Sequence, residues 1–186
     1  WLSVITLYEH TVRLYKYSAP GAWNDPDMLE VGNGELTYEE NKSHFSLWCM
    51  MNAPLILGND VRKFIVDGKV DTDSRVYQIL TNKAMIGINQ DKLGVQCKRV
   101  KTGIVDVLVK PLENRELAVC LLNKSSSSKE MSFSITKLHN EAYVDLPIAK
   151  NYLVKDLWED TEAEATDIVK ATVPSHGVKV FRIKTV

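Results

Sequence analysis

Two carboxylates stand one residue apart in the segment at residues 21–29, which reads GAWNDPDML. Pro26 favours an extended backbone at the residue before it, and side chains two apart in an extended chain point to the same side. Asp25 and Asp27 could therefore face one site, where two carboxylates could share a proton or divide the roles of acid and base. The alternative is that Asp25 caps a turn, as Asp-Pro sequences often do, and that only one carboxylate faces a site.

The tryptophan beside this pair indicates a class of ligand. Trp23 offers a flat apolar surface for the C–H face of a sugar ring, and carboxylates accept hydrogen bonds from sugar hydroxyls. The combination predicts a site for a neutral polyol. It is equally compatible with a tryptophan that simply packs in the core.

Composition excludes several classes of partner. The 186 residues are 45% hydrophobic and 25% charged, with a formal net charge of −1, which is typical of a globular protein. Because basic residues are not gathered in any stretch, neither nucleic acid nor an anionic membrane surface is an expected partner. No apolar run approaches the roughly 18 to 20 residues that a membrane span needs.

The cysteines and histidines do not form the patterns of a metal site. Cys49, Cys97 and Cys120 lie far apart among apolar neighbours, so we expect buried free thiols. The four histidines are not spaced as metal ligands, and neither a metal nor another cofactor is expected. Free thiols mildly favour a cytoplasmic location but leave a secreted one open.

The elements that must position these residues are indicated by the spacing of apolar residues, which differs between the two halves of the chain. In the first half, apolar residues at steps of three and four predict a helix over residues 2–15. Thr37 and Glu40 form a capping-box pair, which predicts a second helix that ends only at the next proline. Residues 54–58 form an apolar run between breakers, which predicts a strand covered on both faces. Counting the segment at residues 21–29 as a strand between the first two helices, and with a further helix from Val76, the order is helix, strand, helix, strand, helix.

From Val95 onward, alternation with period two predicts strands. The clearest examples run through residues 105–109, 117–121, 131–135 and 178–183. Six or more short strands joined by turns indicate an antiparallel β-sandwich that closes a core among its own strands. We therefore place a domain boundary near Val95, between an α/β segment at 1–94 and an all-β domain at 95–186.

Several motifs together resemble a known family. They are GAWNDPDML at residues 21–29, VGNG at 31–34, APL at 53–55, GND at 58–60 and INQDKLGVQ at 88–96. These motifs resemble the C-terminal portion of melibiase-type α-galactosidases, glycoside hydrolase family 27. The resemblance implies that residues 1–94 are the last strands and helices of a (β/α)8 barrel, with 22–31 and 53–58 as the seventh and eighth strands. Residues 95–186 would then be the antiparallel β-sandwich that follows the barrel.

The resemblance also implies which residues would act. The family hydrolyses terminal α-galactosides with retention, using an aspartate nucleophile in a Lys-x-Asp motif on the fourth barrel strand and an aspartate acid/base in an Arg-x-x-x-Asp motif just after the sixth. Because the resemblance begins after the sixth strand, we expect neither motif in this chain. The implied substrate-binding residues are Asp27, Met28 and Trp23, whereas Asp25 looks structural, and no catalytic residue is expected in this chain. The isolated chain is expected to be inactive and to need the missing N-terminal barrel portion, or a second copy, as its partner.

Two alternatives and one departure from the family pattern stay open. A non-catalytic carbohydrate-binding or interaction module built around the sandwich would account for the same residues. Specificity for α-N-acetylgalactosamine is also compatible, because the residues that would contact the 2-substituent of the sugar lie upstream. The departure is at residues 67–73, which lengthen the segment after the eighth strand and leave the start of the last barrel helix open.

Overall fold

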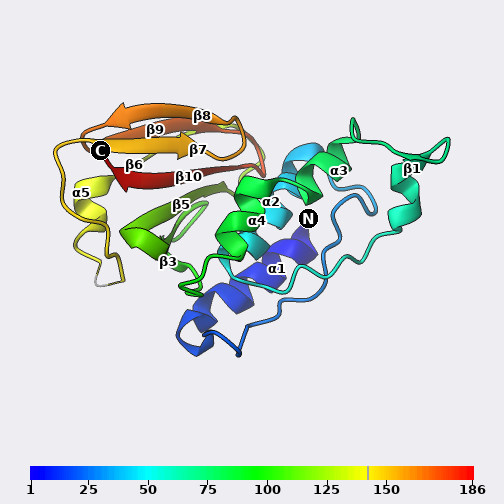
Figure 1. Cartoon of the computed structure of the whole chain (residues 1–186), viewed down its shortest axis with the longest axis horizontal. Helices are drawn as coiled ribbons and strands as arrows, with labels where there is room; N and C mark the ends of the chain where they lie inside the picture. Colours follow the sequence, from blue (N-terminus) through cyan, green and yellow to red (C-terminus); the bar gives the residue numbers. More distant parts are fainter. Residues whose placement is uncertain (142) are drawn as a thin grey trace.

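Helices and long loops make up the first half of the chain, and antiparallel sheets make up the second (Figure 1). The computed structural model describes residues 1–141 and 143–186. Its helices, with η for a 3₁₀ helix, are α1 (Leu2–Thr11), η1 (Val12–Tyr17), α2 (Tyr38–Met50), η2 (Val61–Phe64), α3 (Arg75–Leu80), α4 (Lys83–Asn89), η3 (Glu113–Arg115) and α5 (Ile135–Leu138). Its strands are β1 (Ile65–Val66), β2 (Lys69–Val70), β3 (Lys98–Lys101), β4 (Val105–Leu112), β5 (Glu116–Asn123), β6 (Lys129–Ser134), β7 (Tyr152–Asp156), β8 (Thr161–Ala165), β9 (Ile168–Val173) and β10 (Val178–Thr185).

Two antiparallel sheets form the sandwich. Six strands make the main sheet, in the order β3-β4-β5-β10-β7-β8, and β6 pairs with β9 in a second sheet. The alternating apolar residues of the two sheets meet in one core, in which Val119 and Ile183 of the main sheet cluster with Phe133 of the second. The predicted antiparallel sandwich is confirmed, and the four strands named from alternation correspond to β4, β5, β6 and β10.

The helices begin where local signals place them. The helix predicted over residues 2–15 is α1 followed directly by η1. At the start of α2, the Glu40 N–H donates to the Thr37 hydroxyl at 3.2 Å, and the Glu40 carboxylate accepts from the Thr37 N–H at 2.8 Å. The predicted capping box is therefore confirmed. The far end of α2 comes earlier than predicted, because Asn52 adopts the left-handed backbone conformation, with a φ of 55°.

The run at residues 54–58 is not the strand covered on both faces that its composition predicts. Leu29 and Leu57 form one parallel bridge, in which the Leu29 N–H donates to the Ile56 carbonyl and the Gly58 N–H to the Leu29 carbonyl, both at 2.8 Å. Ile56 and Leu57 remain 58% and 43% exposed. Within residues 1–141 and 143–186 no further strand pairs with this run, so nothing covers its outer side. The parallel direction is nonetheless the one that neighbouring barrel strands have.

The two halves of the chain share a core. Helix α2 lies against the main sheet, and buried residues from both halves form one cluster, including Trp48 and Met50 from α2 with Leu108 and Val180 from the sheet. The three cysteines are free and buried, as expected, and all belong to this cluster. The sandwich does close a core among its own strands, and α2 in addition covers the other face of the main sheet.

A buried charged cluster also joins α1 to the sandwich. The Tyr8 hydroxyl donates to Asp106 at 2.8 Å, and the Asp106 side chain has no exposed surface. Arg99 and Lys124 each bridge Asp106 and Glu9, at distances between 2.7 and 3.1 Å. Because the two partly buried cations have their carboxylate partners on α1 and on β4, separating these elements would leave both cations with fewer partners.

Candidate functional site

Asp27 and Met28 directly precede Leu29, whose backbone forms the parallel bridge with residues 56–58. The Met28 side chain lies beside Gly58, the residue that follows the bridged Leu57. A Cβ at Gly58 would come within 2.5 Å of the Met28 sulfur, which means that the methionine side chain occupies the space that glycine leaves. Met28 is still 46% exposed, so one side of the thioether faces open space at this edge.

Asp27 has a strained backbone that its neighbours hold in place. Its φ is 98°, in a region that residues with a side chain rarely adopt. Its N–H donates to the Asp25 carboxylate at 2.9 Å, and its own Oδ1 accepts from the Met28 N–H at 2.7 Å. The Asp27 side chain is exposed, so Oδ2 is available to a ligand. Strain of this kind is concentrated at functional sites, where the surrounding structure maintains it.

Three polar side chains on one face of α2 bind the backbone of residues 27–32. The Trp48 Nε1–H donates to the Asp27 carbonyl at 2.7 Å. The Glu30 N–H donates to His44 Nε2 at 2.9 Å, and the Gly32 N–H donates to Asn41 Oδ1 at 2.7 Å. The three donors and acceptors are spaced at three and four residues along the helix, which puts them in one row. The buried helix therefore fixes the path of the segment that presents Asp27 and Met28.

The protonation state of His44 suits this contact. Burial of the imidazole lowers the pKa of His44 to about 4. At neutral pH the ring is therefore uncharged, and its Nε2 can accept the Glu30 N–H. The ring also packs edge-on against Trp48, with centroids 4.1 Å apart. His44 acts here as a neutral acceptor within the α2 row.

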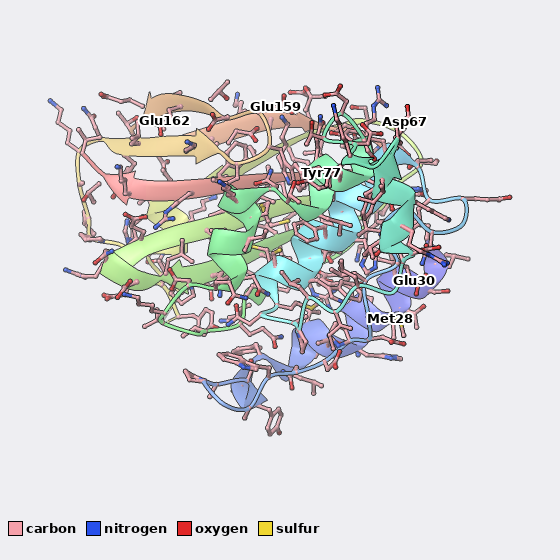
Figure 2. The ribbon with its side chains drawn as sticks, turned by 45° about the vertical axis from the view of Figure 1, so that its right-hand side comes forward. Met28, Glu30, Asp67, Tyr77, Glu159 and Glu162 are labelled. Carbon is pink, nitrogen blue, oxygen red and sulfur yellow. The ribbon has the colours of Figure 1, made fainter. Side chains whose placement is uncertain are left out.

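Glu30 and two asparagines close the edge of the site. The Asn33 amide donates to the Glu30 carboxylate at 2.8 Å and to the Gly58 carbonyl at 3.1 Å. The Asn59 amide donates to the Val31 carbonyl at 3.1 Å. Residues 30–33 and residues 58–59 are thus connected by side-chain hydrogen bonds as well as by the backbone bridge. Met28 and Glu30 are seen together at this edge in Figure 2.

The structure does not bring all the predicted site residues together. Trp23 lies four residues before Asp27, where it is 44% exposed and lines a separate cavity of about 340 Å³ with residues that include Asn52, Ala53 and Asn89. The premise of an extended chain does not hold at Asp27, because its φ is positive. The Asp25 carboxylate instead accepts a hydrogen bond from the Asp27 N–H, which is the turn-capping contact that the sequence analysis gave as the alternative to a catalytic pair.

Sequence reasoning missed the three side chains of the α2 row. The sequence analysis assigned none of Trp48, His44 and Asn41 a contact with residues 27–32. The signal that could have revealed them is the recurrence of hydrogen-bonding side chains on an otherwise buried helical face, at 41, 44 and 48. Buried polar groups need hydrogen-bond partners. The segment after residue 26 offers backbone groups that are not already paired in a regular sheet.

Among residues 1–141 and 143–186, no three His, Cys, Asp or Glu side chains converge in a way that could hold a metal ion. In the same part of the chain, no helix has the length and apolar character needed to cross a membrane.

Comparison with known proteins finds two family models that match consecutive parts of the chain. The model described as "Alpha galactosidase A" matches residues 1–91, and the model described as "Alpha galactosidase C-terminal beta sandwich domain" matches residues 102–183. Together they account for most of both halves.

Individual relatives agree with these models. The chain is 38% identical over 185 residues to an alpha-galactosidase from Cyamopsis tetragonoloba, covering 97% of this chain and 41% of that protein. It is 36% identical over 189 residues to alpha-galactosidase A from Cellvibrio japonicus, covering 97% and 44%. The crystal structure of alpha-galactosidase I from Mortierella vinacea superposes with a TM-score of 0.85 at 29% identity, covering 97% of this chain and 44% of that one. The chain thus spans about two fifths of the length of the curated relatives it matches.

Proposed function

This chain belongs to the melibiase-type α-galactosidases of glycoside hydrolase family 27, and we propose that it forms one wall of the galactose pocket in a complete enzyme. The complete enzyme would hydrolyse terminal α-galactosides with retention of configuration, without a cofactor. The observation that carries this proposal is Asp27, an exposed carboxylate held in a strained conformation two residues before the parallel bridge of Leu29 with Leu57. In (β/α)8 enzymes the active site lies at the carboxyl ends of the strands, and the family resemblance makes residues 22–31 the seventh strand and its loop.

The geometry of Asp27 suggests how it would bind a sugar. Oδ1 is engaged by the Met28 N–H, which fixes the plane of the carboxylate and leaves Oδ2 as the acceptor for a sugar hydroxyl. A hydrogen bond to an ionised acceptor is stronger than one between neutral groups. Met28 would contact an apolar face of the same ring beside it. These contacts position the galactose unit and move no proton.

Bond cleavage would then need two carboxylates that this chain does not supply. In retaining hydrolysis one carboxylate attacks the anomeric carbon while the second protonates the departing oxygen, and water later releases the sugar from the covalent intermediate. The 186 residues contain no Arg-x-x-x-Asp sequence, and their one Lys-x-Asp sequence, at residues 69–71, lies after the expected eighth strand and not on the fourth strand, where the family carries its nucleophile. We therefore propose that both carboxylates come from the remaining barrel portion, and that the 186 residues alone are inactive.

Galactose binding tests the proposed pocket directly. In the complete enzyme, Asp27→Ala should weaken galactose binding by about 1.5 to 3 kcal/mol, the range for hydrogen bonds to charged groups. Asp25→Ala is the matched control: it removes a carboxylate two residues away and should mainly lower the melting temperature. Calorimetric titration with galactose measures both variants. Unchanged affinity in the Asp27 variant would remove this residue from the site.

Trp23 stays a prediction as a substrate-binding residue. Its position in a different cavity from Asp27 and Met28 gives it no part in the contact proposed above. The comparable test is Trp23→Phe, which keeps an aromatic surface while changing its size.

A further inference from the structure

One turn of the sandwich reaches helix α2. Residues 174–177, which read PSHG, connect β9 to β10, and β10 begins beside α2 (Figure 1). His176 in this turn has a φ of 52°, in the left-handed region that residues with a side chain seldom adopt. Its N–H donates to the Ser125 carbonyl at 3.2 Å, so the sandwich itself holds the strained backbone. A maintained strain of this kind marks His176 as a residue with a role to be explained.

His176 makes two hydrogen bonds to the beginning of α2. Its Nδ1 lies 2.7 Å from Glu40 Oε1, and because an ionised carboxylate can only accept, the ring N–H is the donor. The Ser43 hydroxyl donates to the His176 carbonyl at 2.6 Å. The Glu40 side chain is 10% exposed and Ser43 is fully buried. Both contacts therefore belong to the packed junction between the two halves of the chain.

The His176 ring also contacts the residue that precedes α1. It stacks on the Trp1 ring with centroids 4.9 Å apart and an angle of 17° between the planes. Trp1 and Glu40 both line a cavity of about 460 Å³, whose other walls include Glu30 and Asn33. The last two residues are those that close the edge of the candidate site. His176 thus supports, from the sandwich side, two residues of a wall that continues to this edge.

The end of α2 that His176 contacts also holds the loop that enters the helix. The second carboxylate oxygen of Glu40 accepts the Thr37 N–H at 2.8 Å. The next residue, Asn41, donates to the Thr37 carbonyl at 2.9 Å and accepts the Gly32 N–H at 2.7 Å. His176 therefore fixes the residue directly beside the one that binds Gly32.

We propose that His176 is a positioning residue for galactose binding. From the sandwich it holds the beginning of α2, and the α2 row, which consists of Asn41, His44 and Trp48, holds residues 27–32 with Asp27. The proposal rests on the proposed function, because it requires galactose to bind at Asp27. His176 itself touches no sugar. Through this residue the sandwich contributes to the affinity of a site that lies outside it.

The side of the helix that is contacted distinguishes His176 from a second sandwich residue on α2. Trp158 donates to the Ser46 hydroxyl at 3.0 Å. With about 3.6 residues per turn, Ser46 lies on the opposite side of the helix from the α2 row. Glu40 instead adjoins Asn41, the first member of that row. A change at His176 should therefore reach residues 27–32 more directly than a change at Trp158.

The test measures galactose affinity in the complete enzyme by calorimetric titration. His176→Gly removes the ring, and because glycine tolerates a φ of 52°, the turn keeps its backbone and the hydrogen bond from Ser43. We expect the Kd for galactose to rise roughly fivefold, which corresponds to about 1 kcal/mol. His176→Asn keeps a side-chain N–H that can reach Glu40 and also tolerates the left-handed backbone. Its Kd should return to within about twofold of wild type, a difference of about 0.4 kcal/mol.

Two further variants separate positioning from stability. His139→Gly is the matched control, because the His139 ring lies 3.0 Å from the Tyr152 hydroxyl, within the sandwich. This variant should lower the melting temperature and leave the Kd unchanged. Ser43→Ala breaks the attachment from the α2 side, where it removes the donor to the His176 carbonyl. It should raise the Kd as well, which keeps the proposal testable if His176→Gly does not fold.

Three results would overturn the proposal. The first is a wild-type Kd in His176→Gly or, if that variant does not fold, in Ser43→Ala. The second is a Kd of His176→Asn as high as that of His176→Gly, since the bond to Glu40 would then not carry the effect. The third is an equal loss of affinity in His139→Gly, which would tie affinity to stability alone. A wild-type enzyme that binds no galactose would instead overturn the proposed function, and this inference with it.

Discussion

The indole N–H of Trp48 donates a 2.7 Å hydrogen bond to the backbone carbonyl of Asp27. Trp48 is fully buried on α2, whereas Asp27 carries an exposed carboxylate and a strained backbone. Helix α2 also covers one face of the main sheet. The core between the two halves of the chain is therefore connected by one hydrogen bond to the residue proposed to bind galactose.

Removing this donor should affect both stability and binding. Trp48→Phe keeps an aromatic ring but leaves the Asp27 carbonyl without its partner, so the free energy of unfolding should fall by about 1 to 3 kcal/mol. Galactose affinity in the complete enzyme should fall as well, because Asp27 loses the contact that fixes its backbone. Urea unfolding and calorimetric titration measure the two effects.

Trp158→Phe is the matched control for this experiment. The Trp158 indole N–H donates at 3.0 Å to the hydroxyl of Ser46, which lies on α2 as Trp48 does. It makes no hydrogen bond to residues 27–32. This variant should lose stability while binding galactose like wild type. Equal affinity in the Trp48 and Trp158 variants would show that the contact with Asp27 is structural only.

Backbone strain at Asp27 can be separated from the loss of its carboxylate. Glycine tolerates the φ of 98° that position 27 adopts, so the free energy of unfolding of Asp27→Gly should stay within about 1 kcal/mol of wild type. Asp27→Val introduces a β-branched side chain at the same φ and should cost about 1 to 3 kcal/mol more. Both variants should lose galactose affinity to the same extent. Equal stability of the two would mean that the backbone relaxes at this position.

The stability of the chain should depend on His44 in the acid range. The folded state keeps this imidazole neutral down to a pKa of about 4, whereas the unfolded chain takes up a proton near the ordinary value of about 6.5. Its contribution is therefore fully present above about pH 6.5 and is lost as the pH falls toward 4. His44→Gln keeps an acceptor without this titration, so its melting temperature should decline less between these pH values. Parallel melting curves for the two proteins would contradict this assignment.

The buried charged cluster should be far more sensitive than a surface ion pair. Asp106→Asn removes one of the two carboxylates that Arg99 and Lys124 both contact, the fully buried one, and it should cost about 3 to 5 kcal/mol of unfolding free energy. Asp160→Asn breaks the exposed pair with Lys155, and the change should stay within about 0.5 kcal/mol. Denaturant unfolding of the two variants gives the comparison. A small effect of Asp106→Asn would show that the cluster is solvated.

Local signals in the sequence predicted the elements whose causes are local. The capping box of Thr37 and Glu40 needs only residues three apart, and the strands of the sandwich show alternation within single segments. The prediction of a strand covered on both faces at residues 54–58 is wrong, because such burial depends on neighbouring strands. Within the described residues, no further strand pairs with this run. The contact of α2 with the main sheet was not predicted for the same reason, since it joins segments that are far apart in the sequence.

The candidate site shows a similar division. Family motifs singled out Asp27 and Met28 and identified Asp25 as a turn residue, and the Asp25 contact agrees with that reading. The positive φ of Asp27 could not be read from the Asp-Pro pair, which favours an extended chain before the proline and does not specify the residue after it. It is supported by Trp48, 21 positions away in the sequence. Contacts at that separation follow from the fold and not from spacing.

The most direct test of the whole account is a hydrolysis assay on two proteins side by side. The complete enzyme and the purified 186-residue polypeptide are incubated with an aryl α-galactoside, and NMR follows which anomer of galactose appears first. The account predicts that the complete enzyme releases α-galactose and that the polypeptide gives no turnover above background, because pocket contacts cannot replace a nucleophile and a general acid. A complete protein that binds galactose without turnover would favour the carbohydrate-binding module instead. Turnover by the polypeptide that Asp27→Asn abolishes would contradict the account and return Asp25 and Asp27 to the role of a catalytic pair.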